Sequence, residues 1–293
     1  MVSSTRIGRC GSRSVTTSPQ PEFFGTAPRS RLLEPRTMKI DKPRLRNALK
    51  KMRRVPFDHT DPINVAMAPQ EMLDYLAMLA GLKLVCLVGR GFDDPDWVAG
   101  VERLAREMRL QVVNGLEWDA EPEHAGLPDW YSDVAPTDPS PRQVVYICKS
   151  QAVAREVRAV CDMGKIAMED EARLLGYPPC CVRDHYRRNR MFDEALMLMF
   201  QRISGGDEEE MKRIVREDVG VSPETEWEKS LLAEATVHRP APFTSVNMCA
   251  SCSYGSVSPA MRMSRDYDAL VRAISPDLAS EIVRYHAANS GGS

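Results

Sequence analysis

The stretch LLGYPPCCVRDHY, residues 174–186, decides how the second half of the chain is built. Gly176 can end a helix in the left-handed conformation, and Pro178 and Pro179 cannot continue that helix. Proline also fits the first turn of a new helix, so we expect a helix to begin near Cys180. The stretch therefore predicts a sharp junction between two helices, with two adjacent cysteines at the start of the second.

Adjacent cysteines at the start of a helix are suited to metal binding or redox chemistry. Unpaired backbone N–H groups and the helix dipole favour the thiolate there, which is the form that binds metal or attacks an electrophile. Neighbouring side chains diverge by about 100° around a helix, so Cys180 and Cys181 can bind different irons of a cluster. A single zinc ion would have to accept both sulfurs from one tight turn. The alternative is that either cysteine is a small buried hydrophobic residue.

A second cysteine pair follows in NMCASCSY, residues 247–254. The CxxC spacing of Cys249 and Cys252 brings two sulfurs to one metal-sized point, and it also occurs in redox dithiols. A thioredoxin-like motif should follow a strand, whereas prolines precede this pair, so we favour metal ligation. The two pairs supply the four sulfurs of one zinc ion or one iron–sulfur cluster. The adjacency of Cys180 and Cys181 favours the cluster.

Two histidines near these pairs are further candidate ligands. His185 lies on roughly the same predicted helix face as Cys181, and His238 lies upstream of Cys249. Either could replace a cysteine as a ligand or act as a general acid or base, and His185 is the better candidate. The alternative for each is an ordinary surface or interior histidine.

The remaining cysteines do not fit a ligand pattern. Cys10 lies in a polar N-terminal segment, Cys86 and Cys148 lie in apolar strand patterns, and Cys161 lies in a helical pattern. No secretory signal is visible, and reducing compartments disfavour structural disulfides. No apolar run approaches the ~20 residues of a membrane helix. We therefore expect a cytoplasmic protein that has no membrane partner.

The pattern upstream of the cysteines predicts a small α/β fold. The apolar run at 82–88 predicts a buried strand, and an amphipathic helix from about Asp94 to Met108 leads to a second strand at 111–116. A helical crossover of this kind is typical of parallel strands in a βαβ unit. Residues 119–142 read as a long connection to a third strand at 143–148. Further helical patterns cover 41–52, 69–80, 151–175, 181–203, 207–217, 224–236, 259–274 and 276–288.

The predicted fold class is thus α/β, with a small βαβ-type N-terminal portion followed by a mainly helical C-terminal half. We divide the chain into a disordered basic arm (1–37), a small α/β portion (38–150) and a helical domain with the cysteine site (151–293). Residues 1–58 carry 14 Lys and Arg against 4 Asp and Glu, although the whole chain has a net charge of −2. A basic arm of this kind could contact nucleic acid through its phosphates, serve as a transit peptide, or be a plain solvated tail, including one that precedes a true start at Met38.

The GYPPCC string, residues 176–181, resembles the signature of an uncharacterised family of archaeal and bacterial proteins. In that family an LGYPxCC segment is followed by a His-x-Pro-Cys segment and a second cysteine. Leu175 and the His238-Arg239-Pro240 segment match this pattern, but Ala241 stands where the resemblance expects a cysteine. The resemblance covers roughly residues 165–285. It implies kinship and does not imply a settled activity.

Three functions are consistent with these patterns. The first is an iron–sulfur enzyme of unknown substrate that carries out redox or sulfur-transfer chemistry on a small molecule or a protein, with Arg183, Arg187, Arg188 and Arg190 helping to bind an anion. The second is a structural zinc protein whose basic arm contacts nucleic acid. The third is a metal-free thiol redox or sulfur-carrier protein. The sequence names no catalytic residue for any of them.

Overall fold

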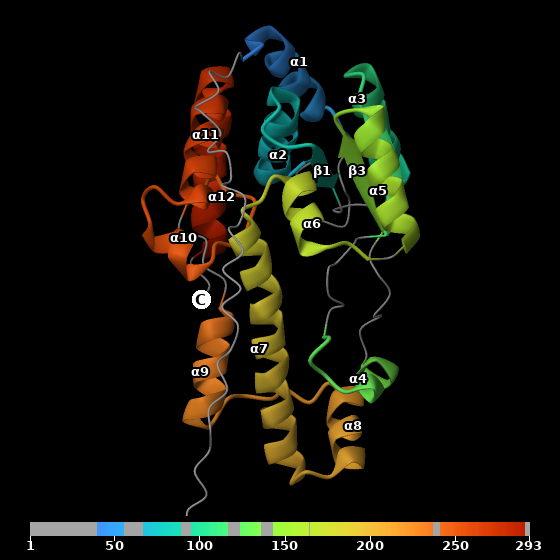
Figure 1. Ribbon diagram of the computed structural model, residues 1–293, viewed down its shortest axis with the longest axis vertical. Coiled ribbons are helices and arrows are strands. Elements are labelled where there is room, and N and C mark those ends of the chain that lie inside the picture. Colours follow the sequence, from blue (N-terminus) through green and yellow to red (C-terminus); the bar gives the residue numbers. More distant parts are fainter. Residues whose placement is uncertain are drawn as a thin grey trace, which may run out of the picture. The chain divides into compact units, whose positions relative to one another are not determined.

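The computed structural model describes residues 40–55, 67–88, 95–116, 124–135, 143–163, 165–236 and 241–290 (Figure 1). These residues belong to one compact unit, Lys39–Ser293, so the predicted portions 38–150 and 151–293 are described together. The predicted basic arm, 1–37, lies outside the described residues. None of the described helices is long and apolar enough to cross a membrane.

The order of elements agrees with the predicted fold class. The N-terminal part contains α1 (Lys42–Met52), α2 (Pro69–Ala80), β1 (Val85–Val88), α3 (Pro95–Glu107), β2 (Gln111–Leu116), α4 (Asp129–Val134) and β3 (Gln143–Cys148). The rest is helical: α5 (Gln151–Met163), α6 (Met168–Leu175), α7 (Pro179–Ser204), α8 (Glu208–Arg216), α9 (Glu226–Ala235), α10 (Ala250–Tyr254), α11 (Pro259–Ile274) and α12 (Pro276–Ser290). The prediction of a small α/β portion before a helical half is confirmed.

The pairing of the strands differs from the expected parallel arrangement. The sheet has the order β1-β3-β2, and both outer strands pair antiparallel with β3. The outer strands therefore run in the same direction, as a helical crossover through α3 requires, but they are not neighbours. β3 takes the central place because residues Val144–Cys148 are all buried, whereas Gln111 and Asn114 of β2 are exposed. The predicted parallel direction of β1 and β2 is present, and the place of the antiparallel strand β3 between them was not predicted.

Helices pack on the sheet through alternate residues of its strands. Val85, Tyr146 and Cys148 share one buried cluster with side chains of α5 and α6. The intervening residues Cys86 and Ile147 are also fully buried, and since successive side chains of a strand point to opposite faces, both faces of the sheet are covered. α2 contacts β1, and it also contacts α11 and α12. Helix α2 thus joins the sheet to the last helices of the chain.

Three helical details differ from the sequence-based expectation. The predicted helix over 151–175 is two helices, α5 and α6, and the sequence between them contains Gly164, a poor helix former. The predicted connection over 119–142 contains α4, whose Trp130 and Tyr131 pack in a cluster with residues of α7 and α8. The third detail is α10, a short helix that begins directly after Cys249.

The junction between α6 and α7 is also where the helical half meets the sheet portion. Gly176 has a left-handed φ of 71°, and a Cβ atom on it would lie 2.8 Å from Cβ of Lys83. The buried Nζ atom of Lys83 lies 3.2 Å from Oδ2 of Asp74 and 5.1 Å from the ring centroid of Tyr177. Burial by itself would lower the pKa of Lys83, but the Asp74 carboxylate and the nearby tyrosines raise it above its usual value. The GYP part of the motif therefore holds a charged lysine between α2 and the start of α7.

We predict that Gly176→Ala destabilises the protein more than Gly205→Ala. Both glycines end helices with a left-handed φ, 71° and 66°, so each alanine variant carries the same backbone strain, roughly 1–2 kcal/mol. Only the methyl group at position 176 would also collide with Lys83, because nothing lies within 4 Å of the corresponding position at Gly205. Urea unfolding measures both free energies. Equal losses would show that Gly176 is needed for its backbone conformation alone.

We predict that Asp74→Ala lowers the free energy of unfolding by about 3 kcal/mol or more, because it leaves the buried ammonium of Lys83 unpaired. The double variant Asp74→Ala/Lys83→Met should recover much of this loss, since no buried charge remains. Lys165→Met, at an exposed position, is the control and should change stability little. A double variant no more stable than Asp74→Ala would contradict the assignment of the loss to the unpaired charge.

Candidate metal centre

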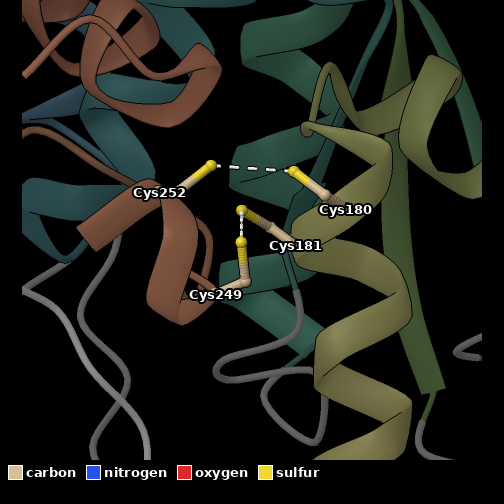
Figure 2. Close-up of side chains that lie close together, drawn as sticks. All are labelled: Cys180, Cys181, Cys249 and Cys252. Carbon is tan, nitrogen blue, oxygen red and sulfur yellow. Dashed lines mark hydrogen bonds between the residues drawn. The ribbon is translucent and has the colours of Figure 1, made fainter. Parts of the chain in front are cut away.

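Each cysteine pair is placed by the start of a helix. Pro178 is the N-cap of α7, so Cys180 and Cys181 are the second and third residues of its first turn. Cys249 is itself the N-cap of α10, and Cys252 lies in the first turn of that helix. The prolines and the CxxC spacing thus have the same result, which is to present two sulfurs from one helix start. Figure 2 shows the two pairs pointing toward each other.

The four sulfur atoms lie close to a single point. All of them lie within 4.8 Å of one another. Sγ of Cys180 lies 3.6 Å from Sγ of Cys252, and Sγ of Cys181 lies 3.9 Å from Sγ of Cys249 (Figure 2). Each of these contacts joins α7 to the 249–252 segment. The predicted grouping of the two pairs is therefore present, and the four residues could together hold a metal ion.

An apolar shell surrounds the sulfur atoms. Cys181, Cys249 and Cys252 are buried, and Cys180 is half-buried. Side chains that pack with the cysteines are mostly apolar and include Tyr177, Ala241, Val246, Met248, Ala260, Met261 and Met263. The shell separates the three buried sulfurs from water, so a charge on any of them must be compensated by nearby donors or by a cation.

Backbone N–H groups supply part of that compensation. Burial opposes ionisation of Cys252, but hydrogen bonds from the N–H of Ala260 and from the other three thiols lower its pKa. Burial and the neighbouring thiols raise the pKa of Cys180 to about 11. Burial also raises the pKa of Cys181, although the N–H of Cys249 donates to its sulfur and opposes the shift. Ala260 lies in the first turn of α11, so the starts of three helices, α7, α10 and α11, meet at the cysteines.

A buried arginine ties the second cysteine pair to α7. Arg188 donates from Nη2 to the carbonyl of Met248, 3.0 Å away, and from Nη1 to the carbonyl of Thr236, 2.6 Å away. Its Nε atom lies 2.7 Å from the carboxylate of Asp184. Met248 directly precedes Cys249, so the guanidinium fixes the backbone that carries the CxxC pair. This role was missed, because the sequence around Arg188 resembles an exposed basic helix; the arginine is buried here and not available as a free anion site.

Ser258 joins α10 to α11 beside the cysteines. Its Oγ donates to the carbonyl of Cys252, 2.8 Å away, and accepts from the N–H of Met261 as the N-cap of α11. The hydroxyl thus links the end of the CxxC segment to the helix whose Ala260 N–H reaches Cys252. This link explains why a helix start lies close to that sulfur.

The other predicted candidates are placed as follows. His185 is half-buried on α7 beside the ring of Tyr186, and burial together with the charge of Arg188 lowers its pKa. It is not in the group of cysteines, which is the one group of this kind among the described residues. His238 and Cys10 lie outside those residues. Cys86, Cys148 and Cys161 lie in β1, β3 and α5, away from the group, as predicted.

Ala241 is buried in the apolar shell around the cysteines. This is the position where the resemblance to the LGYPxCC family expects a cysteine. The group nevertheless has four sulfurs, because Cys249 and Cys252 both reach it. The departure at Ala241 therefore does not leave the group short of a ligand atom.

Comparisons of the chain with protein-family models, with curated proteins and with solved structures found no match. The resemblance to the LGYPxCC family therefore stays a prediction.

The donor set itself limits the chemistry. Four thiols within 4.8 Å of one another are typical of zinc or iron–sulfur sites, and soft sulfur ligands disfavour magnesium or calcium. Because all four ligand atoms come from the protein, a metal ion bound by them would have no open position for a substrate. The arrangement is thus suited to a structural or electron-transfer centre rather than to Lewis-acid catalysis.

We predict that Arg188→Met weakens metal binding by about 10- to 100-fold, as expected for a residue that orients ligands without touching the metal. The substitution removes the donors to the carbonyls of Met248 and Thr236 and frees the CxxC segment. Arg183→Met, at an exposed position on the same helix, is the control and should bind metal as the wild type does. Competition with a coloured zinc chelator measures both affinities. Unchanged affinity in Arg188→Met would show that the CxxC segment is positioned without it.

Proposed function

We propose that Cys180, Cys181, Cys249 and Cys252 bind one zinc ion and that this zinc is a structural centre. The observation that carries the proposal is the mutual distance of the four sulfur atoms, all within 4.8 Å. A zinc–sulfur bond of about 2.3 Å in a tetrahedron places neighbouring sulfurs about 3.8 Å apart. The two contacts at 3.6 and 3.9 Å lie on either side of that value. The spacing therefore fits a single ion with little movement of the side chains.

The role of such a centre is to fasten together segments that are distant in sequence. Cys181 and Cys249 are 68 positions apart, and the first lies on α7 while the second begins α10. α10 has only five residues, Ala250–Tyr254, which is too short to be stable by itself. A bound zinc supplies a cross-link at this place. Binding energy that is realised only in the folded chain adds directly to its stability.

An iron–sulfur cluster is the second candidate, and it was the one favoured by the adjacency of Cys180 and Cys181. Its support is the set of backbone N–H groups that reach the sulfurs of Cys181 and Cys252, since such hydrogen bonds set the potential of clusters. A cluster places the thiolates on different irons and needs a wider spacing than a single ion. The four sulfurs would have to move apart to hold it, so the zinc centre is the better supported.

A metal-free thiol function has the least support. A nucleophilic cysteine needs a low pKa, whereas burial and the neighbouring thiols raise the pKa of Cys180 to about 11. Cys180 is the one member of the four that is half-buried rather than buried, and so the one that a reactant could reach most easily. Without a metal, this most accessible thiol would be neutral at neutral pH.

The nucleic-acid contact through the arm at 1–37 and the cytoplasmic location remain predictions. Exposed basic residues on and after α1 agree with a polyanion partner. Lys42 and Lys50 lie on the helix, and Arg54 follows it. No acidic residue lies in the first turn of this helix. A run of exposed basic residues is equally typical of a solvated surface.

We predict about one zinc ion per chain in anaerobically purified protein, with no acid-labile sulfide and no absorption band near ~400 nm. Serine at Cys180, Cys181, Cys249 or Cys252 should each lower the zinc content, and Cys161→Ser should leave it unchanged. Elemental analysis and a sulfide assay measure both quantities. Stoichiometric iron and sulfide would show that the site holds an iron–sulfur cluster instead of zinc. Full zinc content in all four serine variants would refute the site.

The structural role has its own test. Removal of zinc by a strong chelator should increase amide hydrogen exchange in Cys249–Tyr254 and at the start of α7, because these segments lose their cross-link. Exchange in β3, at the centre of the sheet, should change little and is the internal control. If chelation changed amide exchange equally in all three segments, or in none of them, a structural role would be contradicted.

A further inference from the structure

A cavity of about 260 Å³ lies along the middle of α7, beyond the metal centre. It is lined by His124, Arg188, Asn189, Phe192, Asp193 and Ala235. Four of these residues belong to α7, Ala235 ends α9, and His124 belongs to the segment before α4. The cavity is thus built from three separate segments of the chain.

The cavity contains a histidine that is held by a buried carboxylate. Nδ1 of His124 lies 3.0 Å from Oδ1 of Asp193. The side chain of Asp193 is 3% exposed and that of His124 is 33% exposed. A carboxylate accepts a hydrogen bond from the ring nitrogen that it faces, so the neutral imidazole has its hydrogen on Nδ1 and a lone pair on Nε2. No described residue forms a hydrogen bond with Nε2.

Two further contacts fix this pair. The N–H of Gly126 donates to Oδ2 of Asp193, 3.0 Å away, and a Cβ atom on Gly126 would lie 2.9 Å from Cβ of Asp193. Only glycine therefore allows the chain to approach the carboxylate this closely. The ring centroids of His124 and Tyr131 lie 5.2 Å apart. The backbone of His124 has a φ of 61°. A residue other than glycine in this conformation is uncommon, and the side chain of His124 is held here by Asp193 and by the ring of Tyr131.

The remaining walls determine what the cavity can bind. Arg188 is committed to the carbonyls of Met248 and Thr236 and to Asp184, so its charge is already compensated. No described residue bonds the side-chain amide of Asn189, which can donate to a carbonyl oxygen. Phe192 is 42% exposed and offers an apolar surface beside it. The cavity thus suits a neutral molecule that has a carbonyl group and an apolar portion.

We propose that His124 and Asp193 form a general-base site that hydrolyses small neutral esters. A water molecule gives a proton to Nε2 of His124 while its oxygen forms a bond to the carbonyl carbon. The bond from that carbon to the alcohol oxygen then breaks, and the imidazolium returns the proton to the departing oxygen. The products are a carboxylic acid and an alcohol, and the imidazole is regenerated. Asp193 orients the ring and stabilises the imidazolium, and it is a positioning residue. The site is distinct from the proposed zinc centre.

The test uses the full chain as purified and 4-nitrophenyl acetate as the probe. We expect His124→Gln to lower kcat/KM about 100-fold, the contribution typical of a positioned base. The control is His286→Gln, which removes a histidine of α12 and should hydrolyse the ester at the wild-type rate. Hydrolysis by His124→Gln as fast as by the wild type, or an equal loss in His286→Gln, would overturn the proposal. Zinc content measured in the same preparations separates this outcome from a failure of the metal centre.

Asp193→Asn tests the role of the carboxylate. Because the N–H of Gly126 must still find an acceptor, the amide oxygen of this variant takes that bond and the amide N–H₂ faces Nδ1 of His124. The imidazole hydrogen then moves to Nε2 and the base is lost, so kcat should fall while KM changes little. Two-bond ¹H–¹⁵N spectra of the imidazole report the tautomer directly. A wild-type ring that carries its hydrogen on Nε2, or an Asp193→Asn variant with full kcat, would overturn the proposal.

Discussion

The structure around the candidate metal centre depends on bringing four sulfur atoms to one buried point. Thiolates repel one another and lose their hydration when buried, so such a group is tolerated only if cations or N–H groups face it. The N–H of Cys249, at the start of α10, and the N–H of Ala260, in the first turn of α11, meet part of this need. The course of the chain between the two cysteine pairs is therefore constrained at both of its ends by the same electrostatic requirement.

Much of the fold could be predicted, because hydrophobic periodicity and glycine or proline at element ends are local signals. α2, β2 and β3 lie where the pattern placed them. Strand pairing is not a local property, however. Helical crossovers indicate only that β1 and β2 run in the same direction, and the position of β3 between them depends on which strand buries most of its residues. α4 escaped prediction because it is short and lies in a segment rich in proline.

The cysteines of the candidate site could be predicted from spacing and helix-end chemistry, but their surroundings could not. The divergence of adjacent side chains around a helix suggested that Cys180 and Cys181 serve different irons. In the first turn of α7 both sulfurs reach the same group, as either a zinc ion or an iron–sulfur cluster would require. Arg188 and the N–H of Ala260 were missed, since their roles depend on contacts with residues far away in sequence. Arg188 in particular stands among other basic residues and has no local signal that it is buried.

The separation of the two cysteine pairs also determines when the site can form during synthesis. A ribosome releases Cys180 and Cys181 long before Cys252, which is 72 positions after Cys180. During that interval the start of α7 has neither its sulfur partners nor the N–H group of Ala260. The four sulfurs can therefore meet only after residues 182–252 have been synthesised, so the site is completed near the end of synthesis.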